Sequence, residues 1–387
     1  MNMRMILDSQ VFPLRPAWIE IDLARLRRNV QLVRRELPRN VQLLAVVKDE
    51  AYGHGALNVA RIALEEGATF LGVSTPEEAM ALREAGIKAH ILLLGERQES
   101  ELPWCVAYDL TVCVNDVHTA LKLARVAAGF EKRVPVHVKI NSGMTRYGVR
   151  WDEAFPLLEA IANEPSLQLE GAMTHFSQSD ETVKDFALLQ MSRFDEVMAL
   201  VRQHQVSVTM QHLCNSGGFL DLPQAHRDMV RVGILMYGIF PSTVCRRIEG
   251  IQPVMSVKAR IAALQQLKPG EHVGYGMRYT ATANRRIAVL PIGYGDGFPR
   301  VRNQGHALIH GQRAPLVGGV AMDALMVDVT DIPQAQMWDE AVLMGEQGNE
   351  AITVRDVAQL KNSVTYDVLT GWRLRLRRKC VNGEEDQ

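Results

Sequence analysis

Short apolar strand patterns alternate with helical patterns along much of this 387-residue chain, and this alternation constrains the fold more than any other feature. The first strand pattern, VQLLAVVK (41–48), is too short for a buried helix and is typical of a strand buried on both faces. Seven more follow at Phe70–Val73, His90–Leu94, Leu110–Val114, Pro135–Ile140, Glu170–His175, Val206–Leu213 and Met229–Val232. Eight strands with intervening helices within about 220 residues predict an α/β fold, a (β/α)8 TIM-type barrel, rather than an open doubly wound sheet of about five or six strands.

The pattern changes after Pro241. Short β-rich segments separated by Gly, Pro and Asp follow, and few helical sequence patterns occur until Thr353–Leu360. We therefore expect two domains: a barrel over residues 13–241, and a mainly β domain over residues 242–387 together with residues 1–12.

Composition argues for a small ligand and a cytoplasmic protein. The 43 Lys plus Arg residues nearly balance the 44 Asp plus Glu residues, so no large field favours nucleic acid or an acidic membrane surface. No apolar stretch is long enough to span a membrane, and the N-terminal segment has no signal-peptide pattern. The five cysteines are widely separated and form no C-x-x-C pair, which predicts reduced thiols and no metal site.

A lysine stands where the first strand ends. Barrel enzymes place their reactive side chains at the C-terminal ends of the strands, and Lys48 closes an otherwise apolar strand. A lysine there is unfavourable to bury unless it is paired or chemically used, although a lysine at the rim that reaches solvent has the same pattern.

Loops of small residues follow the seventh and eighth strands. Asn215-Ser216-Gly217-Gly218 and Gly233-Ile234 leave room for backbone N–H groups to approach an anion, although Ser-Gly-Gly also suits a simple bend. A strand-end lysine and a phosphate pocket on one face are what a pyridoxal phosphate enzyme needs. Arg231, on the eighth strand, could face the cofactor ring, where a guanidinium would favour an unprotonated pyridine nitrogen.

Ordered motifs along nearly the whole chain resemble the bacterial alanine racemases, the fold-type III pyridoxal phosphate enzymes. The resemblance implies the barrel and β domain already inferred, and a homodimer with shared active sites that supplies D-alanine for cell-wall synthesis or recycles amino-acid enantiomers. The most specific motifs are AVVK (45–48), AYGHG (51–55), SGMTRYG (142–148), MTHF (173–176), NSGG (215–218), VRVGILMYGIFPS (230–242), VGYGMRYTA (273–281), GYGDGFPR (293–300) and MDALMVDVT (322–330).

The resemblance implies a role for each matched position. Lys48 would hold pyridoxal 5'-phosphate as a Schiff base and deprotonate the D-enantiomer at Cα, and Tyr275 would deprotonate the L-enantiomer from the other face. His175 would hydrogen-bond Tyr275, and Arg231 would face the pyridine nitrogen. The remaining matches are Tyr52, His175, Asn215, Ser216, Gly233, Ile234 and Tyr366 for the cofactor, Arg146, Met322, Asp323 and Tyr275 for the substrate, and Lys139 for a lysine that is carbamylated in some members.

Departures from the family pattern leave the substrate side chain open. Asp49-Glu50, Asn141 and Gly319 differ from the usual residues, and Cys214, Gly217 and Gly218 replace alanines. The segment 371–379 also lacks the S-R-V-P-R motif that is usual in the family. Smaller side chains near the cofactor predict room for a larger substrate. The alternatives are a racemase for serine or for a longer or basic amino acid, a fold-type III decarboxylase, and a non-enzymatic pyridoxal phosphate carrier.

Overall fold

The computed structural model describes residues 15–383 and divides the chain into two compact units. Arg25–Gln252 forms one, here called the barrel unit, and the described residues up to Ala24 join Pro253 and the residues after it in the other, here called the β unit.

The barrel unit contains a sheet of parallel strands in the order β10-β2-β3-β4-β5-β6-β8-β9, with a short β7 (Val149–Arg150) beside β6. The sheet nearly closes on itself, because backbone N–H groups of Asp228 and Arg231 donate to the carbonyls of Gln211 and Cys214 across the remaining gap. All eight strand predictions are confirmed. The strands are β2 (Gln42–Val46), β3 (Phe70–Val73), β4 (His90–Leu93), β5 (Thr111–Val114), β6 (Val134–Asn141), β8 (Leu167–Met173), β9 (Met210–His212) and β10 (Met229–Val232).

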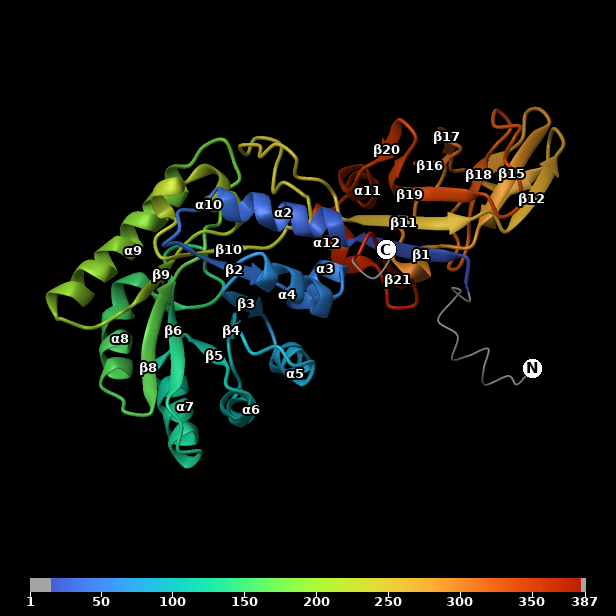
Figure 1. The fold of residues 1–387 in the computed structure, drawn as a ribbon. Helices are drawn as coiled ribbons and strands as arrows, with labels where there is room; N and C mark the ends of the chain where they lie inside the picture. Colours follow the sequence, from blue (N-terminus) through green and yellow to red (C-terminus); the bar gives the residue numbers. More distant parts are fainter. Residues whose placement is uncertain (1–14, 384–387) are drawn as a thin grey trace, which may run out of the picture. The chain divides into compact units, whose positions relative to one another are not determined.

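Helices connect these strands, and Figure 1 shows α5 to α9 around the outside of the sheet. Local sequence sets their ends: Thr75 and Glu78 form a capping box, with Pro76 in the first turn. Gly86, with φ of +87°, follows the end of the same helix. The helices are α2 (Leu23–Arg35), α3 (Lys48–Gly53), α4 (Ala56–Glu65), α5 (Pro76–Glu84), α6 (Leu102–Ala107), α7 (Val117–Gly129), α8 (Ala154–Ala162), α9 (Asp185–Gln203) and α10 (Ser216–Asp221).

Apolar side chains fill much of the barrel interior, and barrel enzymes carry their reactive groups at the C-terminal ends of the strands. The strands are buried almost throughout, as expected for a parallel sheet covered by helices. One interior cluster comprises Leu44, Val46, Phe70, Leu92, Cys113, Met173, Met210 and Met229.

The β unit is built on a seven-stranded sheet in the order β17-β16-β19-β11-β1-β21, with β20 paired to β19. A three-stranded sheet (β12-β15-β18) and a hairpin (β13-β14) accompany it, as do α11 (Val354–Lys361) and α12 (Thr365–Gly371). The strands are β1 (Ala17–Asp22), β11 (Met255–Arg260), β12 (Ala263–Leu267), β13 (His272–Val273), β14 (Tyr279–Thr280), β15 (Arg285–Leu290), β16 (His306–Ile309), β17 (Gln312–Pro315), β18 (Leu325–Asp328), β19 (Glu340–Gln347), β20 (Glu350–Ile352) and β21 (Arg377–Val381).

The division between the units differs from the expected domain boundaries at both ends. Residues from 13 onward were assigned to the barrel, but β1 pairs antiparallel with β11 and parallel with β21. These ladders tie the segment to the β unit because their backbone partners lie only there. The second division follows Gln252 rather than 241. The expectation for residues 1–12 lies outside the described residues.

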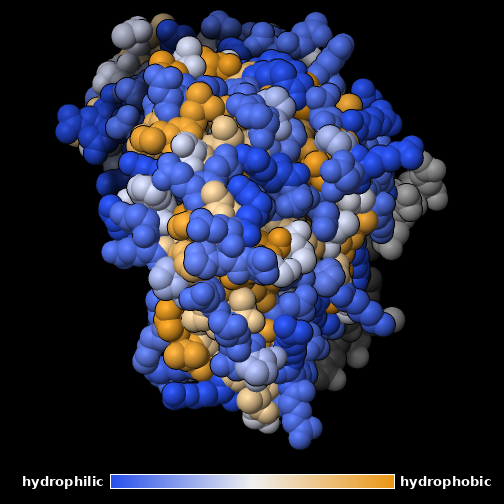
Figure 2. All heavy atoms as spheres, turned by 90° about the vertical axis from the view of Figure 1, so that its left-hand side faces the viewer, coloured by the Kyte–Doolittle hydropathy of each residue, from blue (hydrophilic) through white to orange (hydrophobic). Residues whose placement is uncertain are grey.

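Within residues 15–383, none of the helices is long and apolar enough to cross a membrane. The face shown in Figure 2 is mostly hydrophilic, with small groups of hydrophobic residues between the charged and polar ones.

Candidate active site

Lys48 stands two residues after the last residue of β2, at the end of the barrel where the sequence predicted it. The side chain is half-buried, and burial lowers its pKa, helped by the nearby positive charge of Arg146. Glu78 and Asp49 act in the opposite direction without reversing the shift. A lysine with a lowered pKa is more often neutral, and therefore nucleophilic, than one in water.

An unusual turn follows Lys48. Asp49, Glu50, Ala51 and Tyr52 all have φ near +50° and ψ between 41° and 56°, so four consecutive non-glycine residues are left-handed. Such a conformation costs about 1–2 kcal/mol per residue. Hydrogen bonds offset part of that cost: the Asp49 N–H donates to Glu78 at 2.6 Å, and Glu50 accepts from the Ala56 N–H at 3.2 Å. The turn carries Tyr52 into the barrel interior.

Tyr52, Ser216 and Gly233 form a small cradle at this end of the barrel. The Gly233 N–H donates to Ser216 Oγ at 3.1 Å, and a Cβ on Gly233 would lie 2.9 Å from the Tyr52 hydroxyl oxygen. Burial raises the pKa of Tyr52 to about 12, so its hydroxyl stays protonated and can donate. Asn215 caps α10 by accepting from the Gly218 N–H at 2.9 Å, and Ile234 is buried beside Gly233. The cradle gathers hydroxyl and backbone donors suited to an anion.

The glycines that replace family alanines leave no free space here. A Cβ on Gly217 would lie 2.8 Å from Ser179 Oγ, and one on Gly218 would lie 3.0 Å from the Phe176 ring. The expectation that these small residues make room for a larger substrate is wrong, because neighbouring side chains of the chain itself fill that volume.

Arg231 is buried, with 3% of its surface exposed, and all of its hydrogen-bond acceptors are neutral groups. Burial lowers its pKa to about 10, which leaves the guanidinium charged at neutral pH. Its Nη atoms donate to the carbonyl oxygens of Thr174 (2.8 Å), His212 (2.9 Å) and Leu213 (3.0 Å), and to Nδ1 of His212 (3.0 Å) and of His175 (3.2 Å). The Nε–H group is the donor that none of these bonds uses.

His175 follows β8, and its protonation state is set by Arg231. A guanidinium only donates, so the His175 Nδ1 accepts and a neutral ring carries its proton on Nε2. Burial, followed by the charges of Arg231 and Arg146, holds the pKa of His175 well below its usual value. The ring is therefore a neutral Nε2–H donor.

Lys139 and Arg146 add positive charge to the same end. Lys139 lies near the C-terminal end of β6 with 6% of its surface exposed, and its ammonium lies 5.5 Å from the Tyr147 ring centre. Burial lowers its pKa to about 8, and Arg146, Arg231 and Lys48 contribute repulsion. Arg146 itself is exposed. This concentration of cations favours an anionic ligand.

The other predicted site residues belong to the β unit. Tyr275 is 82% exposed and Met322 is 52% exposed, and Tyr366 lies on α12. Asp323 accepts from Arg375 at 2.6 Å. The barrel unit holds the lysine, the cradle and Arg231, whereas the β unit holds Tyr275.

The Met322–Asp323 loop is fixed by the buried carboxylate of Asp296. Asp296 forms ion pairs with Arg15 at 2.5 Å and with Arg375 at 3.0 Å. The Gly295 N–H donates to the carbonyl of Met322 at 2.8 Å. Arg375 belongs to the segment whose text departs from the family pattern, and it contributes here by bridging Asp296 and Asp323.

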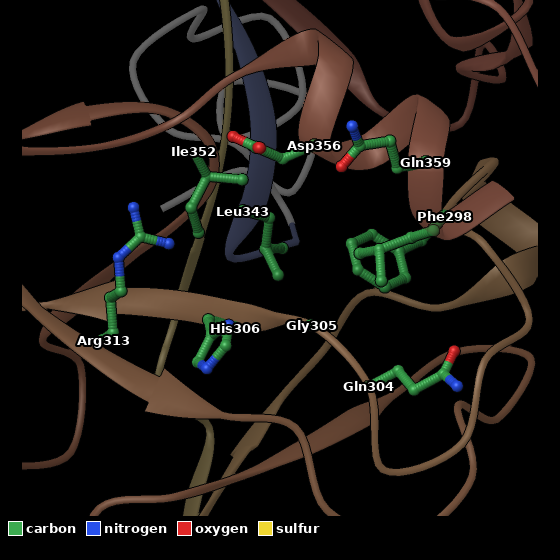
Figure 3. Close-up of a pocket in the computed structure, with 10 residues that line it drawn as sticks. Phe298, Gln304, Gly305, His306, Arg313, Leu343, Ile352, Asp356 and Gln359 are labelled. Atoms are coloured by element: carbon green, nitrogen blue, oxygen red, sulfur yellow. The ribbon is translucent and has the colours of Figure 1, made fainter. Parts of the chain in front are cut away.

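A pocket of about 340 Å³ lies in the β unit between the β16–β17 hairpin, β19 and α11 (Figure 3). Two of its charged side chains are already engaged: Arg313 pairs with Glu350, and Asp356 closes the capping box of α11 with Thr353. None of the predicted site residues lines it. Among the described residues, no group of three metal-ligating side chains could hold a metal ion.

Comparison with known proteins identifies the family. The N-terminal domain model of alanine racemase matches residues 21–241, and the C-terminal domain model matches residues 254–380. The chain belongs to the alanine racemase family. An alanine racemase of Halothermothrix orenii is 38% identical over 95% of this chain and 97% of its own length. One of Syntrophobacter fumaroxidans is 40% identical over 91% and 94%.

Solved structures of the family share the fold. An alanine racemase of Clostridium difficile superposes with a TM-score of 0.91 at 31% identity, covering 96% of this chain and 98% of that one. One from Streptomyces coelicolor gives a TM-score of 0.90 at 34% identity, covering 95% and 98%. The family thus accounts for both units of the chain.

Sequence reasoning missed three residues that the structure connects to Arg231. His137, His212 and Glu170 form a buried series of hydrogen bonds that ends on the guanidinium. The available signal was a histidine in each of two apolar strand patterns, VHVK and QHL. That signal is weak, because strand histidines are often only structural.

Proposed function

We propose that this protein is a pyridoxal 5'-phosphate-dependent racemase that interconverts L- and D-alanine. The observation that carries the proposal is the pairing of a strand-end lysine of lowered pKa with a buried arginine in place of an acid. Membership of the alanine racemase family supports the reaction and the substrate.

The barrel unit fits the cofactor. Lys48 would hold the aldehyde carbon covalently, and the cradle of Tyr52, Ser216 and Gly233 would receive the phosphate, with the Ile234 backbone, Asn215 and the Tyr366 hydroxyl as further contacts. The unused Nε–H of Arg231 would donate to the pyridine nitrogen. Because a guanidinium is always charged, it disfavours a proton on that nitrogen. Bound pyridoxal phosphate supplies an electron sink that makes the substrate Cα–H acidic.

Racemisation needs one base on each face of Cα. Lys48 removes or returns the proton on one face, and the Tyr275 of the partner subunit does so on the other. A phenol with a pKa near 10 is a poor base at neutral pH. His175 corrects this, because its neutral Nε2–H donates to the phenolic oxygen and stabilises the phenolate.

Arg146 would bind the substrate carboxylate, and the family resemblance implies the backbone of the Met322–Asp323 loop as a further contact. Lys139 orients Arg146. With a pKa of about 8, a fraction of its amine is neutral at neutral pH and can react with carbon dioxide to form a carbamate, with release of one proton. The carbamate would pair with that arginine.

The substrate side chain, the oligomeric state and the cellular compartment complete the proposal. The filled space around Gly217 and Gly218 supports a small side chain such as that of alanine over a longer or basic one. The family resemblance supports a homodimer in which each subunit lends Tyr275 to its partner, and five free cysteines, four of them buried, are consistent with a reducing cytoplasm.

A chiral chromatography screen of the purified protein with added pyridoxal phosphate, against all common L-amino acids, tests the proposal. L-alanine should be converted to a mixture of both enantiomers, Lys48→Ala should abolish the conversion, and the exposed Lys88→Ala should not. Faster conversion of serine or a basic amino acid would correct the substrate. Loss of the carboxylate as carbon dioxide, or cofactor binding without turnover, would overturn the racemase assignment.

A further inference from the structure

A continuous series of hydrogen bonds crosses the barrel interior and ends on Arg231. Glu170 Oε2 lies 2.9 Å from His137 Nε2, and His137 Nδ1 lies 2.7 Å from His212 Nε2. His212 Nδ1 in turn lies 3.0 Å from Arg231 Nη1. The four residues come from four strands, β8, β6, β9 and β10, and are called the buried relay below.

Local backbone features place the relay. Glu170 is an extra residue in β8, because Val136 of β6 faces Leu169 while His137 faces Gly171. Such a bulge re-aims a side chain. Gly171 is also needed, since a Cβ there would lie 2.7 Å from the His137 ring.

The two ends fix the direction of every bond. The guanidinium can only donate, so His212 accepts at Nδ1 and, being neutral, carries its proton on Nε2. That proton is donated to His137 Nδ1, and the His137 proton on Nε2 is donated to the carboxylate of Glu170, which only accepts when ionised. A single arrangement therefore satisfies the whole relay.

Burial keeps both imidazoles neutral. Both rings are fully buried, and burial lowers the pKa of His137 and holds the pKa of His212 well below its usual value. Burial raises the pKa of Glu170, but the hydrogen bond that Glu170 accepts from His137 lowers it, and the net shift is downward. Glu170 is thus ionised, with 14% of its side chain exposed.

We propose that Glu170 is a positioning residue for Arg231, acting through His137 and His212. Its carboxylate supplies the negative end of the relay, whereas the direct acceptors of Arg231 are neutral. By fixing the tautomers of both histidines, Glu170 fixes the position of Arg231 Nη1. That position sets the plane of the guanidinium and therefore the direction in which Nε–H points. The part of this inference that concerns catalysis rests on the proposed role of Arg231 at the pyridine nitrogen.

The direction of the relay gives a sharp test. In Glu170→Lys, an ammonium would donate to His137 Nε2, which forces the His137 proton onto Nδ1. The His212 proton would then move to Nδ1, where it faces a guanidinium donor. Glu170→Gln keeps an acceptor and should rescue the arrangement, while Glu170→Leu removes the acceptor without supplying a donor. Gln168→Lys, at an exposed position on the same strand, is the matched control.

Nitrogen-15 NMR of histidine and arginine side chains, on protein without substrate, reads the tautomers directly. Wild type, Glu170→Gln and Gln168→Lys should show His137 and His212 as neutral Nε2–H tautomers at about pH 7 to 8.5, above their lowered pKa values. Glu170→Lys should convert His137 to the Nδ1–H form and speed hydrogen exchange at Arg231 Nη. If Glu170→Lys does not fold, Glu170→Leu should still speed that exchange relative to Glu170→Gln. Nδ1–H or cationic rings in wild type, or unchanged exchange in these variants, would overturn the proposal.

Kinetics provide the second arm. Glu170→Lys should lower kcat by about tenfold or more, the factor expected for losing one hydrogen bond to a charged group, and Glu170→Gln should lower it much less. In an Arg231→Lys background, Glu170→Lys should have little further effect on kcat, because the guanidinium that the relay orients is absent. An equal loss in both backgrounds would mean that Glu170 is only structural. Correct tautomers in a protein that racemises nothing would instead reject the proposed function.

Discussion

Gly233→Ala tests the phosphate cradle from the geometry alone. The new Cβ would lie 2.9 Å from the Tyr52 hydroxyl oxygen, 3.3 Å from Cζ of the same ring and 3.4 Å from Val46 Cβ. Tyr52 cannot easily retreat, because it stands on the left-handed turn and its ring packs 5.1 Å from that of Tyr237. Overpacking of this kind costs about 1–3 kcal/mol. When this energy destabilises the cofactor-bound protein, its affinity for pyridoxal phosphate should drop roughly 5- to 150-fold.

The assay is titration of cofactor-free protein with pyridoxal phosphate, alongside thermal unfolding without cofactor. Gly129→Ala is the control, because no atom lies within 4 Å of its Cβ position. In a Tyr52→Phe background, which lacks the clashing oxygen, Gly233→Ala should cost clearly less. Cofactor affinity unchanged by Gly233→Ala, or an equal loss in both backgrounds, would refute the cradle.

Two further predictions concern Lys139 and the shared sites. With carbon-13 bicarbonate, a carbamate NMR signal should appear in wild type and be absent in Lys139→Ala. It should grow between about pH 6.5 and 8.5, because the lowered pKa of about 8 makes the neutral amine available as pH rises; a signal in both proteins would place the carbamate elsewhere. Lys48→Ala and Tyr275→Phe homodimers should each be nearly inactive, but after mixing and refolding activity should approach about 25% of wild type, since half of randomly paired dimers hold one intact site of two. Heterodimers seen by native mass spectrometry that stay inactive would show that Tyr275 works within its own subunit.

The barrel was predictable because its signals are local. Each strand is a short apolar run, and each intervening helix has its own period and caps, as in the Thr75 and Glu78 capping box. The position of Lys48 at a strand end then indicated the reactive end of the barrel without any knowledge of long-range contacts.

Features that depend on distant partners could not be predicted from local sequence. The sequence of the strand Ala17–Asp22 alternates apolar and polar residues, a pattern that does not show to which sheet a strand belongs. Only its pairing with Met255–Arg260 and Arg377–Val381 assigns it to the β unit. The volume around Gly217 likewise depends on Ser179, which fills it. Composition could suggest a void but could not show that another segment occupies it.

The left-handed turn and the buried relay could not be predicted from the sequence for a different reason. Asp49–Tyr52 contains no glycine or asparagine, the residues that usually mark positive φ, so its conformation is imposed by surrounding contacts such as the Glu78 hydrogen bond. His137 and Glu170 meet only through a one-residue bulge, which shifts the register of a strand pair.

Solvent deuterium incorporation at Cα tests two-base racemisation most directly. In heavy water, wild-type protein should exchange the Cα proton of both alanine enantiomers. Tyr275→Phe should abolish exchange from L-alanine but leave exchange from D-alanine, because Lys48 can still remove and return the proton on its own face. Equal loss of exchange from both enantiomers, or exchange from L-alanine that survives in Tyr275→Phe, would contradict the assignment of one base to each face.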